Sequence, residues 1–124
     1  MASVTLAPLE LSLRTSRTTY RRGNAIKLIL TVNNLSTSTA SLTPNSSTDG
    51  ITVSRGSTLV SRNYRSVGSV SSPLTLEAGK STRLTTTWNG RGNQGGPKRL
   101  QPGVYTIEAS EGGYTASTTV RIVG

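Results

Sequence analysis

The stretch Ser81–Ile107 reads STRLTTTWNGRGNQGGPKRLQPGVYTI and carries the strongest signal for the fold. Its first residues alternate between two faces, one of which carries Thr82, Leu84, Thr86 and Trp88. A period of two is typical of a half-buried β-strand. The indole is the only one in a chain that lacks Phe, so we expect it to anchor the hydrophobic core.

Outward from this stretch, alternating apolar residues predict further strands. The clearest is Ala25–Asn33, which we place at the centre of a sheet because one face carries Ile26, Leu28, Leu30 and Val32. Tyr20–Asn24 is predicted as a turn in which Gly23 takes a positive φ. A first strand is predicted over Val4–Leu13, interrupted by Pro8, which would mark an edge or a kink. Other strands are predicted over Ile51–Val53, Thr58–Tyr64, Leu74–Leu76, Val104–Ser110 and Tyr114–Val123, with a weaker one in Ser36–Leu42. About seven or eight short strands separated by turn residues describe an all-β fold, an antiparallel β-sandwich with Greek-key connections.

Length and composition limit the classes of protein. The 124 residues predict one domain over residues 1–124. The chain has neither Cys nor His, which excludes a disulfide framework and removes the usual zinc, copper and haem ligands. We see no signal peptide or membrane span, so we expect a protein that is cytoplasmic or assembled into a particle or surface structure. The sequence does not fix the compartment.

The charge is strongly basic. Fourteen Lys and Arg residues against five Asp and Glu give a formal net charge of +9, and Arg outnumbers Lys. An excess of this kind indicates an acidic partner, which is a protein, an anionic surface or a nucleic acid. A bias in base composition, with the charges simply solvated, is the alternative.

Three clusters of basic residues are candidates for partner binding, and two of them include a tyrosine. They are Arg14, Arg17, Arg21, Arg22 and Lys27 with Tyr20; Arg55, Arg62 and Arg65 with Tyr64; and Arg91, Lys98 and Arg99. Interleaved Tyr and Arg are able to stack bases and hold phosphates on a sheet face. Solvated loops and edge-strand charges that prevent edge-to-edge pairing are the alternative. The candidate partner-binding residues are Tyr20, Arg21, Arg22, Arg62, Tyr64, Arg65, Arg91, Lys98 and Arg99.

Catalysis is not predicted. The five acidic residues are scattered, and no His or Cys is present to act as a base or nucleophile. The glycines after Trp88 fit neither the spacing of a phosphate-binding loop nor a following helix. We therefore expect no catalytic residue, no metal site, no cofactor and no small-molecule substrate.

Several motifs together resemble the bacterial intracellular proteinase inhibitor (BsuPI) family of immunoglobulin-like domains. They are a strand ending in Asn over Leu28–Asn34, the LTLEAGKS segment Leu74–Ser81, Trp88, and QPGVYT over Gln101–Thr106. A similar arrangement occurs in the immunoglobulin-like part of flagellar hook-capping proteins. The resemblance implies an immunoglobulin-like sandwich in which Tyr105 packs across the core, with tight turns of positive φ at Gly79 and Gly103.

Three functions follow as hypotheses. The first is a non-enzymatic interaction or structural module that docks onto a protein assembly, such as a cell-surface filament or a virion. The second, implied by the resemblance, is a proteinase inhibitor that presents Lys98-Arg99 to a protease specificity pocket. The third is binding of nucleic acid or another anionic surface through the basic loops, with an affinity that falls steeply with salt.

Overall fold

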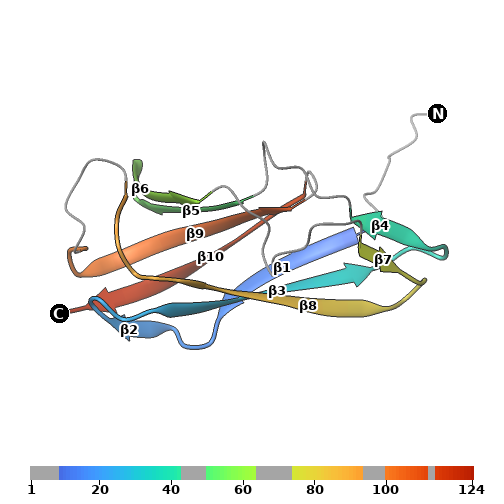
Figure 1. Ribbon diagram of the computed structural model, residues 1–124, viewed down its shortest axis with the longest axis horizontal. Helices are drawn as coiled ribbons and strands as arrows, with labels where there is room; N and C mark the ends of the chain where they lie inside the picture. Colours follow the sequence, from blue (N-terminus) through green and yellow to red (C-terminus); the bar gives the residue numbers. More distant parts are fainter. Residues whose placement is uncertain (1–8, 43–49, 64–73, 94–99, 112–113) are drawn as a thin grey trace.

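The structure is a computed structural model that describes residues 9–42, 50–63, 74–93, 100–111 and 114–124. These residues form ten strands and no helix, arranged as a β-sandwich (Figure 1). The strands are β1 (Leu9–Thr15), β2 (Thr19–Arg21), β3 (Ile26–Asn34), β4 (Ala40–Leu42), β5 (Gly50–Arg55), β6 (Thr58–Asn63), β7 (Leu74–Leu76), β8 (Ser81–Trp88), β9 (Gly103–Glu111) and β10 (Tyr114–Val123).

One layer is a three-stranded antiparallel sheet in the order β1-β3-β8. The register places Ile26 opposite Trp88 and Leu13 opposite Leu30, so the inward residues of the three strands coincide. The central position of β3 confirms the prediction for Ala25–Asn33, because its inward residues are completely buried between two flanking strands. Trp88 is buried as well and anchors the core as expected.

The other layer is a five-stranded sheet in the order β2-β10-β9-β5-β6. Strands β5 and β6 form a hairpin that turns at Gly56, and β9 pairs antiparallel with both β5 and β10. The inward residues of this sheet include Val53, Ile107 and Val120, which are buried against the inward residues of β3. A small third sheet pairs β4 with β7.

The β-sandwich is confirmed, but two details of the prediction are wrong. The described residues form ten strands rather than seven or eight, and the strand that the sequence does not predict is β2, whose three residues are too few to show alternation. The predicted turn Tyr20–Asn24 begins inside β2, which pairs parallel with the end of β10, so the sheet is not purely antiparallel. Gly23 does turn the chain, with a φ of 88°.

Two polar anchors fix the ends of the strands. The side-chain amide of Asn34 is buried at the end of β3 and donates to the carbonyl oxygens of Leu76 (2.9 Å), Ser38 (2.9 Å) and Glu77 (3.2 Å). The Tyr105 hydroxyl donates to the Gln101 carbonyl oxygen at 2.6 Å, which ties the start of β9 to the segment before it. Gly79 lies in a turn with the expected positive φ, 73°, whereas Gly103, with a φ of 153°, begins β9 and is not in a tight turn.

Candidate docking site at one end of the sandwich

Eight of the described strands meet at one end of the sandwich. Strands β1, β2, β5, β8 and β10 finish there, and β3, β6 and β9 begin there (Figure 1). The register agrees, because Ile26 opens β3 opposite Trp88 at the end of β8, and Gly103 opens β9 opposite Ile122 near the end of β10. The connections at this end therefore lie near one another although they are far apart in sequence.

We define the basic end as the Arg and Lys residues on these strand ends and connections. They come from six segments, and all but the half-buried Arg22 are exposed. Among the described residues of these segments there is no Asp or Glu. The basic end comprises Arg17, Arg21, Arg22, Lys27, Arg55, Arg91 and Arg121.

The acidic residues within the described ranges lie elsewhere. Glu10 is near the start of β1, Glu77 is in the turn before β8, and Glu111 ends β9, so all three are at the opposite end of the sandwich together with Lys80. Glu108 is exposed on the outer face of the five-stranded sheet, between the two ends. The charges of the described residues are therefore separated along the long axis, and their field favours approach of an anionic group to the basic end.

Local hydrogen bonds hold Arg91 at this end. The Trp88 indole N–H donates to the Arg91 carbonyl oxygen at 3.2 Å, and the Arg91 N–H donates to Asn89 Oδ1 at 2.9 Å. Gly90 has a φ of 75°, and a Cβ atom there would overlap the backbone carbonyl of Asn24. The turn that carries Arg91 therefore packs directly against the turn that follows Arg22.

The remaining segments are fixed in similar ways. The Arg22 N–H donates to the Val123 carbonyl oxygen at 2.7 Å, which attaches the end of β2 to the end of β10. The Arg55 guanidinium lies 6.0 Å from the centre of the Tyr105 ring, a distance at the limit of a cation–π contact. A Cβ atom on Gly103 would come within 3.2 Å of this guanidinium, so glycine leaves room for it.

The predicted partner-binding residues divide into three groups. Arg21, Arg22 and Arg91 come together in the basic end, although the sequence places them in two separate clusters. Arg62 is exposed on β6 and lies outside this cluster. Tyr64, Arg65, Lys98 and Arg99 lie outside the described residues.

Tyr20 differs from its predicted role. Its side chain is only 7% exposed and belongs to the core, so its ring does not form a surface platform for stacking. Its hydroxyl is bonded to Ser16 Oγ at 2.8 Å and accepts the Arg17 N–H at 3.0 Å. Sequence reasoning also missed Arg121, although its outward position in the alternation of the last strand was a usable signal.

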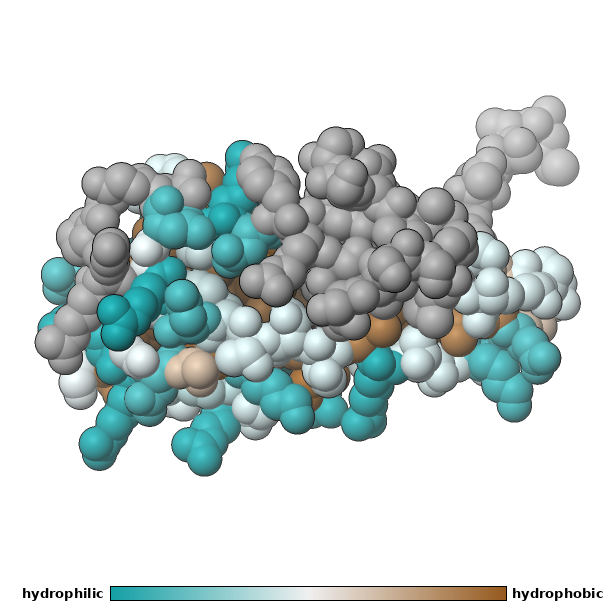
Figure 2. All heavy atoms as spheres, viewed as in Figure 1, coloured by the Kyte–Doolittle hydropathy of each residue, from teal (hydrophilic) through white to brown (hydrophobic). Residues whose placement is uncertain are grey.

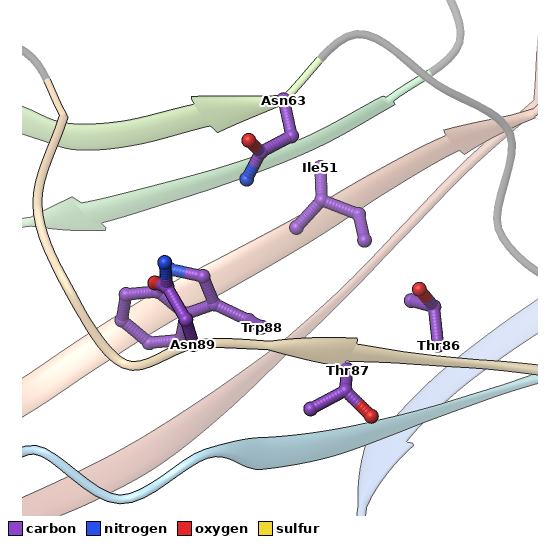
Figure 3. Close-up of a pocket in the computed structure, with 6 residues that line it drawn as sticks. All are labelled: Ile51, Asn63, Thr86, Thr87, Trp88 and Asn89. Carbon is purple, nitrogen blue, oxygen red and sulfur yellow. The ribbon is translucent and has the colours of Figure 1, made fainter.

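A cleft opens next to the basic end, between the free edges of the two sheets (Figure 3). Ile51 and Asn63 line it from the β5–β6 side, and Thr86–Asn89 line it from the end of β8. Its volume is about 200 Å³, below the roughly 300–1,000 Å³ of typical small-molecule sites. A single side chain is therefore a better match to it than a whole substrate or cofactor.

Metal and membrane sites were also considered. Within the described ranges, no group of acidic side chains is positioned to hold a metal ion. The described residues also contain no helix of the length and apolarity that a membrane span needs.

Solved structures share the fold. The Pseudomonas fluorescens alkylpurine DNA glycosylase AlkC, bound to DNA containing an abasic site analog, matches with a TM-score of 0.64 and 13% identity, over 97% of this chain and 32% of its own. A β-glucosidase from Listeria innocua in complex with glucose matches with a TM-score of 0.55 and 13% identity, over 94% of this chain and 16% of its own. The CARDB domain of PF1109 from Pyrococcus furiosus matches with a TM-score of 0.51 and 17% identity, over 94% of both chains.

At these identities the likeness concerns the fold. This chain spans 32% of the glycosylase and 16% of the glucosidase, so the same fold occurs there as one part of a longer chain. A search of the curated proteins finds no match. The model of a family of unknown function (DUF7974) matches residues 2–123, and the chain therefore belongs to that family.

Proposed function

We propose that this protein is a non-enzymatic, immunoglobulin-like interaction module that docks through its basic end onto an acidic face of a protein assembly, such as a cell-surface filament or a virion. The observation that carries the proposal is the gathering of Arg and Lys from six segments at one end, where the described residues include no acid. Most of these cations are arginines, which suit interfaces because the guanidinium is weakly hydrated and binds carboxylates in a fork.

The fold supports a docking role. Its interior is filled by side chains of both sheets, and the cleft described above is too small for a typical substrate. In the AlkC and β-glucosidase structures a similar fold forms part of a larger chain.

A pair of matched variants tests the proposal. Arg21→Glu with Arg91→Glu reverses two charges of the basic end, whereas Lys80→Glu with Arg83→Glu reverses two charges away from it. Each pair lowers the formal net charge of +9 by the same amount. The probe is labelled poly-glutamate, and its binding is followed by fluorescence anisotropy at low and physiological salt.

We expect the basic-end pair to lose about tenfold or more in affinity and the control pair to lose about twofold at most, because charge pairs contribute chiefly at short range. Equal losses for the two pairs contradict a localised docking site. Circular dichroism of both variants confirms that they remain folded.

Binding of nucleic acid is the second candidate. It is favoured by the net charge of +9 and by the likeness to a protein whose structure was solved with DNA. A duplex DNA probe distinguishes it: tight binding to the duplex and none to poly-glutamate replaces the first proposal with this one. A steep fall in duplex affinity with salt is then expected.

Inhibition of a protease is the third candidate, and it rests on the resemblance to the BsuPI family. The residues on either side of 94–99 are well held, because the Asn93 N–H donates to the Val60 carbonyl oxygen at 2.9 Å and Leu100 is buried in the core. A loop whose flanking residues are held in place loses less conformational freedom on binding a protease. Unchanged activity of a panel of subtilisins and trypsin at micromolar protein excludes this candidate.

A further inference from the structure

We propose that the free edge of β8, beside the cleft, binds an extended acidic segment of the partner by strand addition. The inference deepens the proposed function and rests on it, because it names the conformation and chemistry of what is docked. Extended peptides of this kind gain affinity from main-chain hydrogen bonds and specificity from a pocket for alternate side chains.

The backbone of β8 has groups directed to that edge. The Asn34 N–H donates to the Lys80 carbonyl oxygen at 2.8 Å, so the backbone carbonyl of Lys80 is directed toward β3. Hydrogen-bonding direction alternates along an antiparallel strand, and Arg83, Thr85 and Thr87 therefore direct their N–H and C=O groups away from β3. No described residue forms a backbone hydrogen bond with these groups.

The edge of the opposite sheet differs, because Asn93 caps it. The Arg62 N–H donates to Asn93 Oδ1 at 2.9 Å, and Asn93 Nδ2 donates to the Arg62 carbonyl oxygen at 3.0 Å. This side-chain amide therefore occupies the place of a neighbouring strand on β6. On the other side of the sandwich, the edge strand β1 of the three-stranded sheet packs close to β10 of the five-stranded sheet. Among the described strands, the long edge that lies open beside a cleft is that of β8.

The cleft has the chemistry for an acidic or amide side chain. Asn89 and Asn63 line the cleft from opposite sheets, and each has a side-chain amide (Figure 3). The oxygen of the Asn89 amide accepts the Arg91 N–H, and its nitrogen is a hydrogen-bond donor. Thr86 adds a hydroxyl, and Ile51 and Trp88 form apolar walls. The Trp88 indole N–H is already bonded to the Arg91 carbonyl oxygen, so the remaining donors are amides and hydroxyls.

Charge selects an acidic segment. The described residues of the hairpin β5–β6 and of the segment Ser81–Asn93 include no Asp or Glu. The same two segments carry exposed guanidinium groups at Arg55, Arg62 and Arg91. An extended chain that alternates acidic residues with small apolar ones would place carboxylates near these cations while its backbone pairs with β8.

The experiment uses a labelled peptide of about eight residues that alternates Glu with Val. Thr85→Pro removes an edge-directed N–H and leaves the bonds between β3 and β8 intact, because proline is tolerated on an edge strand. Thr85→Val is the matched control, which changes the same side chain and keeps the N–H. We expect Thr85→Pro to weaken binding about tenfold and Thr85→Val to stay within about twofold of the wild type.

A second measurement does not depend on the variant folding. The same peptide is N-methylated either at every Glu or at every Val, and both forms are measured against the unaltered protein. Strand addition predicts that one form loses most of its affinity and the other keeps it, because alternate N–H groups face β8 and solvent.

Equal affinities for the two methylated forms, or for Thr85→Pro and Thr85→Val, overturn strand addition. A different result contradicts the proposed function: the variant Arg21→Glu with Arg91→Glu binds poly-glutamate as tightly as the wild type does. If that pair loses affinity while the β8 tests are negative, the basic end docks acidic surfaces without pairing to β8.

Discussion

Asn34 is the residue on which the end of the three-stranded sheet depends. It is 1% exposed, its amide donates to three carbonyl oxygens, and its Oδ1 accepts from the Ser36 N–H at 3.0 Å and the Ser36 hydroxyl at 2.7 Å. Its own backbone bonds both Gly79 and Lys80, so β3 is joined to the turn that starts β8. One amide therefore satisfies several backbone groups that would otherwise be buried without partners.

Substitution of this residue tests that role. We predict that Asn34→Ala lowers the free energy of unfolding by about 3 kcal/mol, because buried carbonyl groups lose their donors. The measurement is urea denaturation. Asn33→Ala is the control, because Asn33 is half-buried on the outer face, and its loss should stay below about 1 kcal/mol. A loss of the same size in both variants would show that the amide network is unimportant.

Two glycines with positive φ differ in whether a side chain would fit. Gly23 has a φ of 88° and open space where a Cβ would lie, whereas Gly90 has a φ of 75° and a backbone carbonyl in that position. Gly90→Ala should therefore cost more stability than Gly23→Ala, by about 1–2 kcal/mol. It should also weaken poly-glutamate binding, since the turn presents Arg91. Equal stabilities of the two variants would contradict this packing.

Among the elements, the edge of β6 is protected by a side chain rather than a strand. Asn93 bonds both backbone groups of Arg62, and its own N–H bonds the Val60 carbonyl oxygen. An exposed edge strand is a template for pairing with another chain. The cap therefore limits association through β6.

Removal of the cap should open that edge. We predict that Asn93→Ala increases self-association, seen by light scattering as a mass that rises with concentration, whereas Asn33→Ala does not change it. A loss of about 1 kcal/mol in stability should accompany the change, since two side-chain hydrogen bonds are replaced by water. An Asn93→Ala protein that stays monomeric at all concentrations would show that the amide is not a cap.

The sequence predicts most of the strands, including the short β7, but it misses β2. Strands β3, β8 and β10 carry enough alternating residues to reveal which face is buried, and the structure agrees. Strand β2 is not predicted from the sequence because its three residues form a strand only by pairing parallel with β10, which is a non-local contact. The hairpin β5–β6 is visible in the sequence, but its bulge after Val53 is not.

The candidate site is predicted only in part, for a related reason. Clusters of Arg are visible along the chain, but their convergence at one end depends on which strand ends coincide. Arg121 is outside every cluster in the sequence and reaches the basic end through the pairing of β10 with β2. Tyr20 appears suited to a surface role beside Arg21, yet the same pairing places it opposite Ile122 and inside the core.

For the whole molecule, the separation of charge along the sandwich governs association. The basic end and the acids at the far end form a dipole on a molecule whose net charge is +9. We predict that affinity for poly-glutamate falls by at least about tenfold between 50 and 200 mM salt, because exposed charges are screened over that range. Titration by anisotropy measures it. An affinity independent of salt would assign docking to apolar contacts instead.

The most direct test of docking through the basic end uses the native source extract. The wild-type chain, Arg21→Glu with Arg91→Glu, and Lys80→Glu with Arg83→Glu are each added with a label and separated by size-exclusion chromatography with light scattering at physiological salt. We predict that the wild type and the Lys80/Arg83 variant elute with a large assembly while the Arg21/Arg91 variant elutes as a monomer. Elution of all three proteins as monomers, or of all three with the assembly, would contradict the proposal.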